Sequence, residues 1–174
     1  MKVVYSWVFI YIVSLFISFN DNRYHITQLV DMNGIGLYIG SDCDNSLVEK
    51  NRIINTGYNG IHFGGNYTKV INNLVDNFCL FKQDGGGIYM NSDGFRDRNN
   101  TGREITGNIV INGKGTRFGT LEDTEIAEGI YLDDNTAGVK VTKNTIAHVN
   151  GKGIFLHNAN NIQINENLFY KTKS

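Results

Sequence analysis

Two sequence patterns recur in step along most of this 174-residue chain. The first is glycine, an apolar residue, an aromatic residue or histidine, and a second apolar residue, and it occurs at residues 36–39, 60–63, 87–90, 129–132 and 153–156. The second is a β-branched residue followed three positions later by asparagine, at residues 48–51, 70–73, 105–108, 141–144 and 164–167. The shortest spacings between the asparagines, 22 and 23 residues, predict a solenoid of stacked coils, and the longer ones, 35 and 36, indicate inserted loops.

Strand geometry explains why such a chain should coil. Side chains of a strand alternate between its faces, so Ile61 and Phe63 should point inward and stack on their counterparts in neighbouring coils. The recurring asparagines should form an internal ladder, each amide hydrogen bonded to the next about 4.8 Å away. Asn108 is expected to be buried in this ladder, and Asn112 to be exposed. The patterns therefore predict an all-β fold, a parallel β-helix of about five to six coils.

Composition agrees with many short strands joined by tight turns. The chain has 24 Asn, 20 Gly and no Pro, and Asn and Gly are poor in strands and common in turns. Hydrophobic residues make up 41% of the chain, enough to bury a core, which argues against disorder. A net charge of −1 argues against nucleic acid or an anionic membrane as the partner.

Residues 3–19 carry no charge and follow Lys2, as in a signal peptide or a membrane anchor. A rival interpretation makes the end of this leader a first core strand, because residues 17–22 have the same form as residues 139–144 and would extend the ladder to Asn22. We divide the chain into the leader, 1–19, and a β-helix domain, 20–174, which could be part of a longer solenoid. Cys43 and Cys79 have neither a metal nor a disulfide spacing, so we expect buried thiols.

The repeat register, with the strings KQDGGGIY (82–89) and EGIYLDDN (128–135), resembles the right-handed parallel β-helix repeat proteins of secreted bacterial carbohydrate-active enzymes. The resemblance covers residues 17 to 170. It implies a secreted or cell-surface protein, possible anchoring through residues 3–19, and a polysaccharide or oligosaccharide partner. We expect a monomer.

Two outward columns follow from the strand alternation. One consists of Tyr38, His62, Tyr89, Tyr131 and Phe155, and its neighbour of Gly40, Gly64, Asn91, Asp133 and His157. Aromatic faces suit the C–H faces of sugar rings, and the second column supplies polar groups. We therefore predict that substrate is bound by Tyr89, Asn91, Tyr131, Phe155 and His157. Aromatic stacking for stability alone is the alternative.

Carboxylates gather at the same place, because Asp133 and Asp134 end a strand and Asp84 precedes the glycine of the strand one coil earlier. Glycoside hydrolysis needs one carboxyl group as acid and one as base or nucleophile. Asp84, Asp133 and Asp134 are therefore the predicted catalytic residues. Related hydrolases also carry Asn-Thr-Asp and Gly-His-Gly motifs, which this chain lacks, and Asp-Asp-Asn can simply be a turn.

The leading hypothesis is hydrolysis of glycosidic bonds, without a cofactor or metal, and with residues 93–102 walling one side of the cleft. A polysaccharide lyase is the second hypothesis. It would use Lys82, Arg117 or Tyr131 as base, and a cation such as Ca²⁺ would neutralise the uronate. A non-catalytic glycan-binding or structural module is the third.

Overall fold

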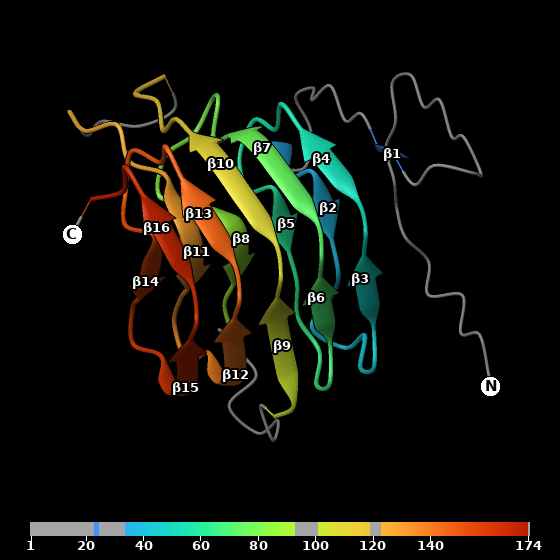
Figure 1. Ribbon diagram of the computed structural model, residues 1–174. Helices are drawn as coiled ribbons and strands as arrows, with labels where there is room; N and C mark the ends of the chain where they lie inside the picture. Colours follow the sequence, from blue (N-terminus) through green and yellow to red (C-terminus); the bar gives the residue numbers. More distant parts are fainter. Residues whose placement is uncertain (1–22, 25–33, 93–100, 119–122, 174) are drawn as a thin grey trace.

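The computed structural model describes residues 23–24, 34–92, 101–118 and 123–173. These residues form short strands in three sheets, and every strand pair is parallel (Figure 1). Successive strands of the chain lie in successive sheets, so the chain winds around one axis. The prediction of an all-β parallel solenoid is confirmed.

Each sheet collects one strand from every coil. Sheet A consists of β1 (Arg23–Tyr24), β4 (Arg52–Ile54), β7 (Leu74–Phe78), β10 (Ile109–Gly113), β13 (Thr145–Ala147) and β16 (Leu168–Tyr170). Sheet B consists of β2 (Leu37–Tyr38), β5 (Ile61–His62), β8 (Gly86–Met90), β11 (Glu128–Leu132) and β14 (Ile154–Leu156). Sheet C consists of β3 (Leu47–Glu49), β6 (Lys69–Ile71), β9 (Arg103–Thr106), β12 (Ala137–Thr142) and β15 (Asn160–Asn165).

Sheet B is built from the glycine pattern, in register. Ile61 pairs with Ile88, Ile88 with Ile130, and Ile130 with Ile154. Ile61, Ile88 and Ile130 are completely buried, as are Phe63 and Leu132, which lie two residues after Ile61 and Ile130. The predicted inward alternation is therefore confirmed, and these side chains form the core together with Val and Ile residues from sheets A and C.

The glycine that opens each sheet B strand lies where sheet B turns away from sheet A. A Cβ atom at Gly36 would come within 2.6 Å of the Gly60 carbonyl oxygen and of an Ile53 methyl group in sheet A. Gly60, Gly87 and Gly129 face the same two kinds of neighbour, a carbonyl of the next coil and a sheet A side chain. The recurring glycine is thus explained by close approach of two chain segments at a sharp corner.

The asparagine ladder lies between sheets C and A. The Nδ2 group of Asn51 donates to Oδ1 of Asn73 at 3.0 Å, and the links Asn73 to Asn108, Asn108 to Asn144 and Asn144 to Asn167 are each 2.9 Å. Each Oδ1 atom also accepts the backbone N–H of the preceding ladder residue at 2.9–3.0 Å. Asn73, Asn108 and Asn144 are buried, so the predicted ladder is confirmed.

Left-handed backbone positions recur beside this ladder. The residue before each ladder asparagine has a positive φ, at Lys50, Asn72, Gly107, Lys143 and Glu166. A second column of residues with positive φ lies at the ends of the sheet A strands, at Asn55, Asn77, Asn112, His148 and Lys171. Asn and Gly adopt this conformation at least cost, which accounts for their abundance.

The prediction that Asn112 is exposed was wrong, because it is half-buried and donates to Asp76 at 2.8 Å.

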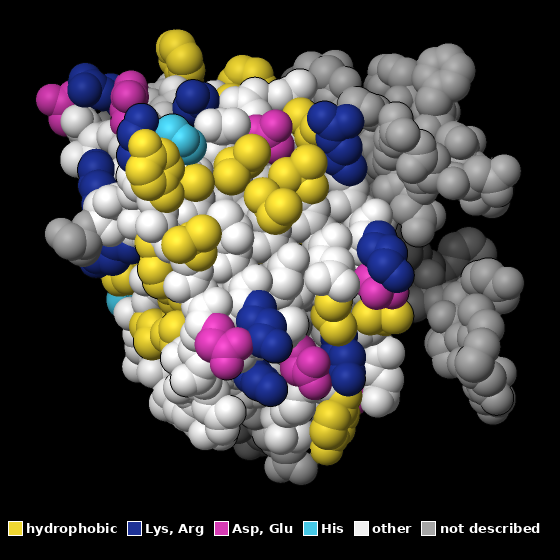
Figure 2. Space-filling view, in the orientation of Figure 1, with side chains coloured by type: hydrophobic (Ala, Val, Ile, Leu, Met, Phe, Trp, Pro, Cys, Tyr) yellow, Lys and Arg dark blue, Asp and Glu magenta, His cyan; other side chains and the backbone are white. Residues whose placement is uncertain are grey.

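The outer face of sheets A and C mixes cationic and anionic side chains, and sheet B lies on the far side of this view (Figure 2). Lys69 and Glu104, for example, form an ion pair at 3.3 Å. The leader, 1–19, and Asn22 lie outside the described residues. Arg23, the residue after Asn22, pairs with Arg52, the residue after Asn51.

Of the two cysteines, Cys79 is buried as predicted, whereas Cys43 is half-buried, so the prediction was wrong for Cys43. Within the part of the chain that the structure describes, no helix has the length and apolar character needed to cross a membrane.

Candidate functional site

The residues that follow three consecutive sheet B strands lie side by side. The N–H of Asp133 donates to the carbonyl of Met90 at 2.8 Å, and the N–H of His157 donates to the carbonyl of Leu132 at 3.0 Å. Because strands β8, β11 and β14 are in register, Asp133 lies between Asn91 and His157. Three polar side chains that are distant in sequence therefore share one edge of sheet B.

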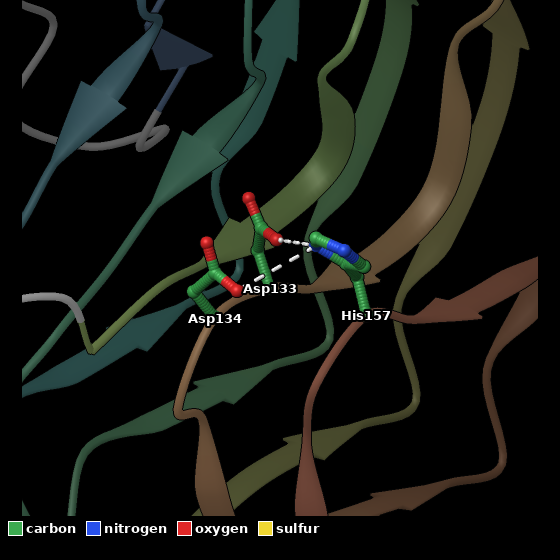
Figure 3. Close-up of side chains that lie close together, drawn as sticks. All are labelled: Asp133, Asp134 and His157. Carbon is green, nitrogen blue, oxygen red and sulfur yellow. Dashed lines mark hydrogen bonds and ion pairs between the residues drawn. The ribbon is translucent and has the colours of Figure 1, made fainter.

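Both carboxylate oxygens of Asp133 are hydrogen bonded. Oδ1 lies 2.7 Å from Nδ1 of His157, a contact drawn in Figure 3. Oδ2 accepts the hydroxyl of Tyr89 at 2.7 Å. Burial would raise the pKa of Asp133, but the hydrogen bonds from His157 and Tyr89 outweigh it and hold this pKa below its usual value. The same hydrogen bond to Asp133 raises the pKa of His157. The Asp133 side chain is 15% exposed and the His157 side chain is 55% exposed. A partly buried carboxylate is therefore hydrogen bonded to an exposed imidazole.

Asp134 belongs to a tight turn, as the alternative interpretation of Asp-Asp-Asn proposed. The N–H of Thr136 donates to the carbonyl of Asp133 at 3.0 Å, and Asn135 has a φ of 58°. The Asp134 carboxylate is nevertheless half-exposed, lying 3.7 Å from Nδ1 of His157 and accepting the side chain of Asn158 at 3.4 Å. The turn thus presents the Asp134 side chain instead of burying it.

Asp133, Asp134 and His157 could together hold a divalent cation. One ligand atom from each lies within 4.8 Å of the others, and Figure 3 shows the three side chains converging. Carboxylate oxygens suit Ca²⁺ and Mg²⁺, and an added imidazole suits transition metals.

Asp84 lies in the loop between β7 and β8, so its backbone precedes the sheet B strand, whereas Asp133 follows the end of β11. The Asp84 side chain is exposed. Burial raises the pKa of Tyr131 most, and the charges of Asp84 and Asp133 raise it further. The Tyr131 phenol therefore lies near both carboxylates.

The aromatic column forms a continuous stack. Ring centroids are 5.0 Å apart for Tyr38 and His62, 4.8 Å for His62 and Tyr89, 5.2 Å for Tyr89 and Tyr131, and 4.9 Å for Tyr131 and Phe155. Tyr89 is only 7% exposed and Tyr131 only 4%, so their ring faces are not open to a sugar. Burial is the largest cause of the raised pKa of both phenols, which therefore stay protonated as hydrogen-bond donors.

Phe155, by contrast, is half-buried, and Nζ of Lys152 lies 4.2 Å from its ring centroid. Elsewhere in the column, burial lowers the pKa of His62 to about 4, although the hydrogen bond that its imidazole donates to Asn91 acts in the opposite direction. Asn91 thus contacts the column as well as the polar edge.

Sequence reasoning missed Tyr58, which lies outside both repeat patterns. Its hydroxyl donates to the backbone carbonyl of Asp84 at 2.7 Å, and Nζ of Lys82 lies 5.3 Å from its ring centroid. Of the proposed lyase bases, Lys82 is therefore close to the site, whereas Arg117 is paired with Asp123 at 2.7 Å. The expected cleft wall, 93–102, lies outside the described residues except for Thr101 and Gly102.

The comparisons with known proteins agree with this architecture. A family model described as the right handed beta helix region matches residues 17–174. No curated protein and no solved structure matches the chain. Because the family match spans most of the sequence and the sheets are parallel and stacked coil upon coil, this chain belongs to the right-handed β-helix family.

Proposed function

We propose that this protein hydrolyses glycosidic bonds of a polysaccharide on sheet B, with Asp84 and Asp133 as the catalytic pair. The observation that carries the proposal is the nearness of both carboxylates to the Tyr131 phenol, whose pKa their charges raise. Glycosidases place two carboxyl groups about 5–10 Å apart on either side of the bond that they cleave.

The surroundings of the two carboxyl groups divide the roles. Asp133 is stabilised as an anion by its hydrogen bonds with Tyr89 and His157. The Asp84 side chain is exposed, so it can reach a leaving group. We therefore assign the base or nucleophile role to Asp133 and the acid role to Asp84.

In the proposed reaction, Asp84 protonates the glycosidic oxygen as the bond to the leaving sugar breaks. Asp133 stabilises the developing positive charge at the anomeric carbon, either by attacking it or by activating water. The exposed Asp84 side chain suits contact with a leaving group, and the half-exposed Asp134 is suited to binding a sugar hydroxyl. His157 and Phe155 would bind the sugar on the neighbouring coil.

The experiment is a reducing-sugar assay on a panel of plant and bacterial polysaccharides, with Asp84→Asn and Asp133→Asn as the test variants. Asp123→Asn is the matched control, because its carboxylate is 92% exposed and pairs with Arg117. We expect each test variant to lose at least about 100-fold in kcat, as is typical for an acid or base. Activity that survives both substitutions would rule out this catalytic pair.

Elimination by a lyase is the second candidate, favoured by the Asp133, Asp134 and His157 cluster and by Lys82, which lies over the Tyr58 ring. Such a reaction forms an unsaturated product that absorbs ultraviolet light, and it would be lost with a chelator or with Lys82→Met. Glycan binding without turnover, unaffected by Asp133→Asn, would instead favour a non-catalytic module.

A further inference from the structure

The loop that carries Asp84 is held in a restricted backbone conformation. Cys79 and Asp84 both have positive φ, 55° and 54°, which side chains other than Gly and Asn adopt at a cost. The start of the loop is held by Gly57, whose carbonyl accepts the N–H groups of Phe81 and Lys82 at 2.9 and 3.1 Å. Such positions persist only where surrounding contacts determine them.

Tyr58 supplies the contact at Asp84 itself. The phenol hydroxyl donates to the Asp84 carbonyl at 2.7 Å, and the next residue, Gly85, lies directly against the Tyr58 ring. A Cβ atom at position 85 would come within 2.5 Å of ring atom Cε2 and 2.6 Å of Oδ1 of Asn59. That same Oδ1 accepts the N–H of Gly86 at 2.8 Å. Tyr58 and Asn59 therefore contact the backbone of residues 84–86 together.

Tyr58 is itself fixed to the coil stack. Its N–H donates to the carbonyl of Gly34 and its carbonyl accepts the N–H of Cys79, both at 2.9 Å. Burial and then the Asp84 charge raise the pKa of Tyr58 well above its usual value, so the hydroxyl remains a donor across the physiological pH range. The Tyr58 hydroxyl, fixed on one coil, thus donates to the Asp84 carbonyl in the loop of the next coil.

We propose that Tyr58 is the positioning residue for Asp84: its O–H···O=C hydrogen bond holds Asp84 in the left-handed conformation that turns the carboxyl group toward Tyr131 and Asp133. The catalytic consequence of this role rests on the proposed function, whereas the conformational role does not. Tyr58 needs no contact with substrate for this purpose.

The test is Tyr58→Phe, which removes one oxygen atom, with Tyr67→Phe, an exposed tyrosine on another loop, as control. NMR of the unliganded protein reads the φ-dependent coupling of Asp84 and the amide hydrogen exchange of residues 84–86. Because one hydrogen bond is lost, we expect Tyr58→Phe to increase this amide exchange about tenfold. The Asp84 coupling should shift toward the average over several φ values, and Tm should change little. Tyr67→Phe should leave both signals unchanged.

Asp84 signals identical in Tyr58→Phe and the wild type would overturn the proposal. A substrate arm separates this outcome from failure of the proposed function. On any polysaccharide of the panel that the wild type hydrolyses, Tyr58→Phe should lower kcat about tenfold at unchanged KM, and an equal kcat would also overturn the positioning role. If the wild type hydrolyses none of them, the hydrolase proposal fails while the NMR result still decides the role of Tyr58.

Discussion

Replacing Asn108 by leucine should destabilise the solenoid strongly, although leucine has a similar volume. The Asn108 side chain is completely buried, donates to Asn144 Oδ1 and the Val70 carbonyl, and accepts the N–H and Nδ2 groups of Asn73. Leucine leaves the buried N–H of Asn73 without this acceptor, which costs about 1–3 kcal/mol, and it removes amide hydrogen bonds worth about 1 kcal/mol more. The expected loss in unfolding free energy is therefore about 2–4 kcal/mol.

Urea denaturation followed by circular dichroism measures this loss, and a thermal scan should show Tm lower by about 4–16 °C. The control is Asn165→Leu, because Asn165 is exposed at the end of β15 and is not among the residues with positive φ. Asn112 is a poorer control, because its φ of 60° would also strain leucine. We expect less than about 0.5 kcal/mol for the control. Equal losses for the two variants would refute the energetic role of the ladder.

Three further predictions concern the sheet B side. His62 has a pKa of about 4 in the folded state against 6.5 when unfolded, so stability should fall as the pH drops from about 6.5 to 4, and His62→Phe should flatten this slope in urea titrations by pH. Gly129→Ala should cost about 1–3 kcal/mol in denaturation, because its Cβ would overlap the Gly153 carbonyl and Ile146; an unchanged midpoint would contradict the corner geometry. Asp133→Asn should lower the pKa of His157 toward its ordinary value in an NMR titration, and an unaltered curve would show that the pair does not form.

The repeat and the ladder could be predicted because they depend on local rules that the chain repeats in every coil. Alternation places Ile61 and Phe63 on the inner face, and the same short pattern in each coil brings Asn73, Asn108 and Asn144 into one column. The neighbours Asp133 and His157 follow from the same register, since each comes directly after a sheet B strand.

Other features of the site could not be predicted from alternation. The pattern places Tyr89 and Tyr131 on the outer face of sheet B, but it does not say what lies over that face, and both rings are buried. Asp84 is in a loop with no repeat, where Cys79 and Asp84 have left-handed backbone and Tyr58 donates to the Asp84 carbonyl. Tyr58 matches neither pattern and carried no sequence signal.

The amino-acid sequence alone therefore determined the coil, its core and the column in which Asp133 lies, because periodicity is a property of the chain that needs no knowledge of its neighbours. Only the tertiary structure decided which carboxylates lie near Tyr131, and that the buried Tyr89 donates to Asp133 instead of presenting its ring to solvent. The physical reason is that such contacts join a loop to the coil beside it, and the path of a loop is set by specific hydrogen bonds and close approaches, here those of Tyr58 and Gly85.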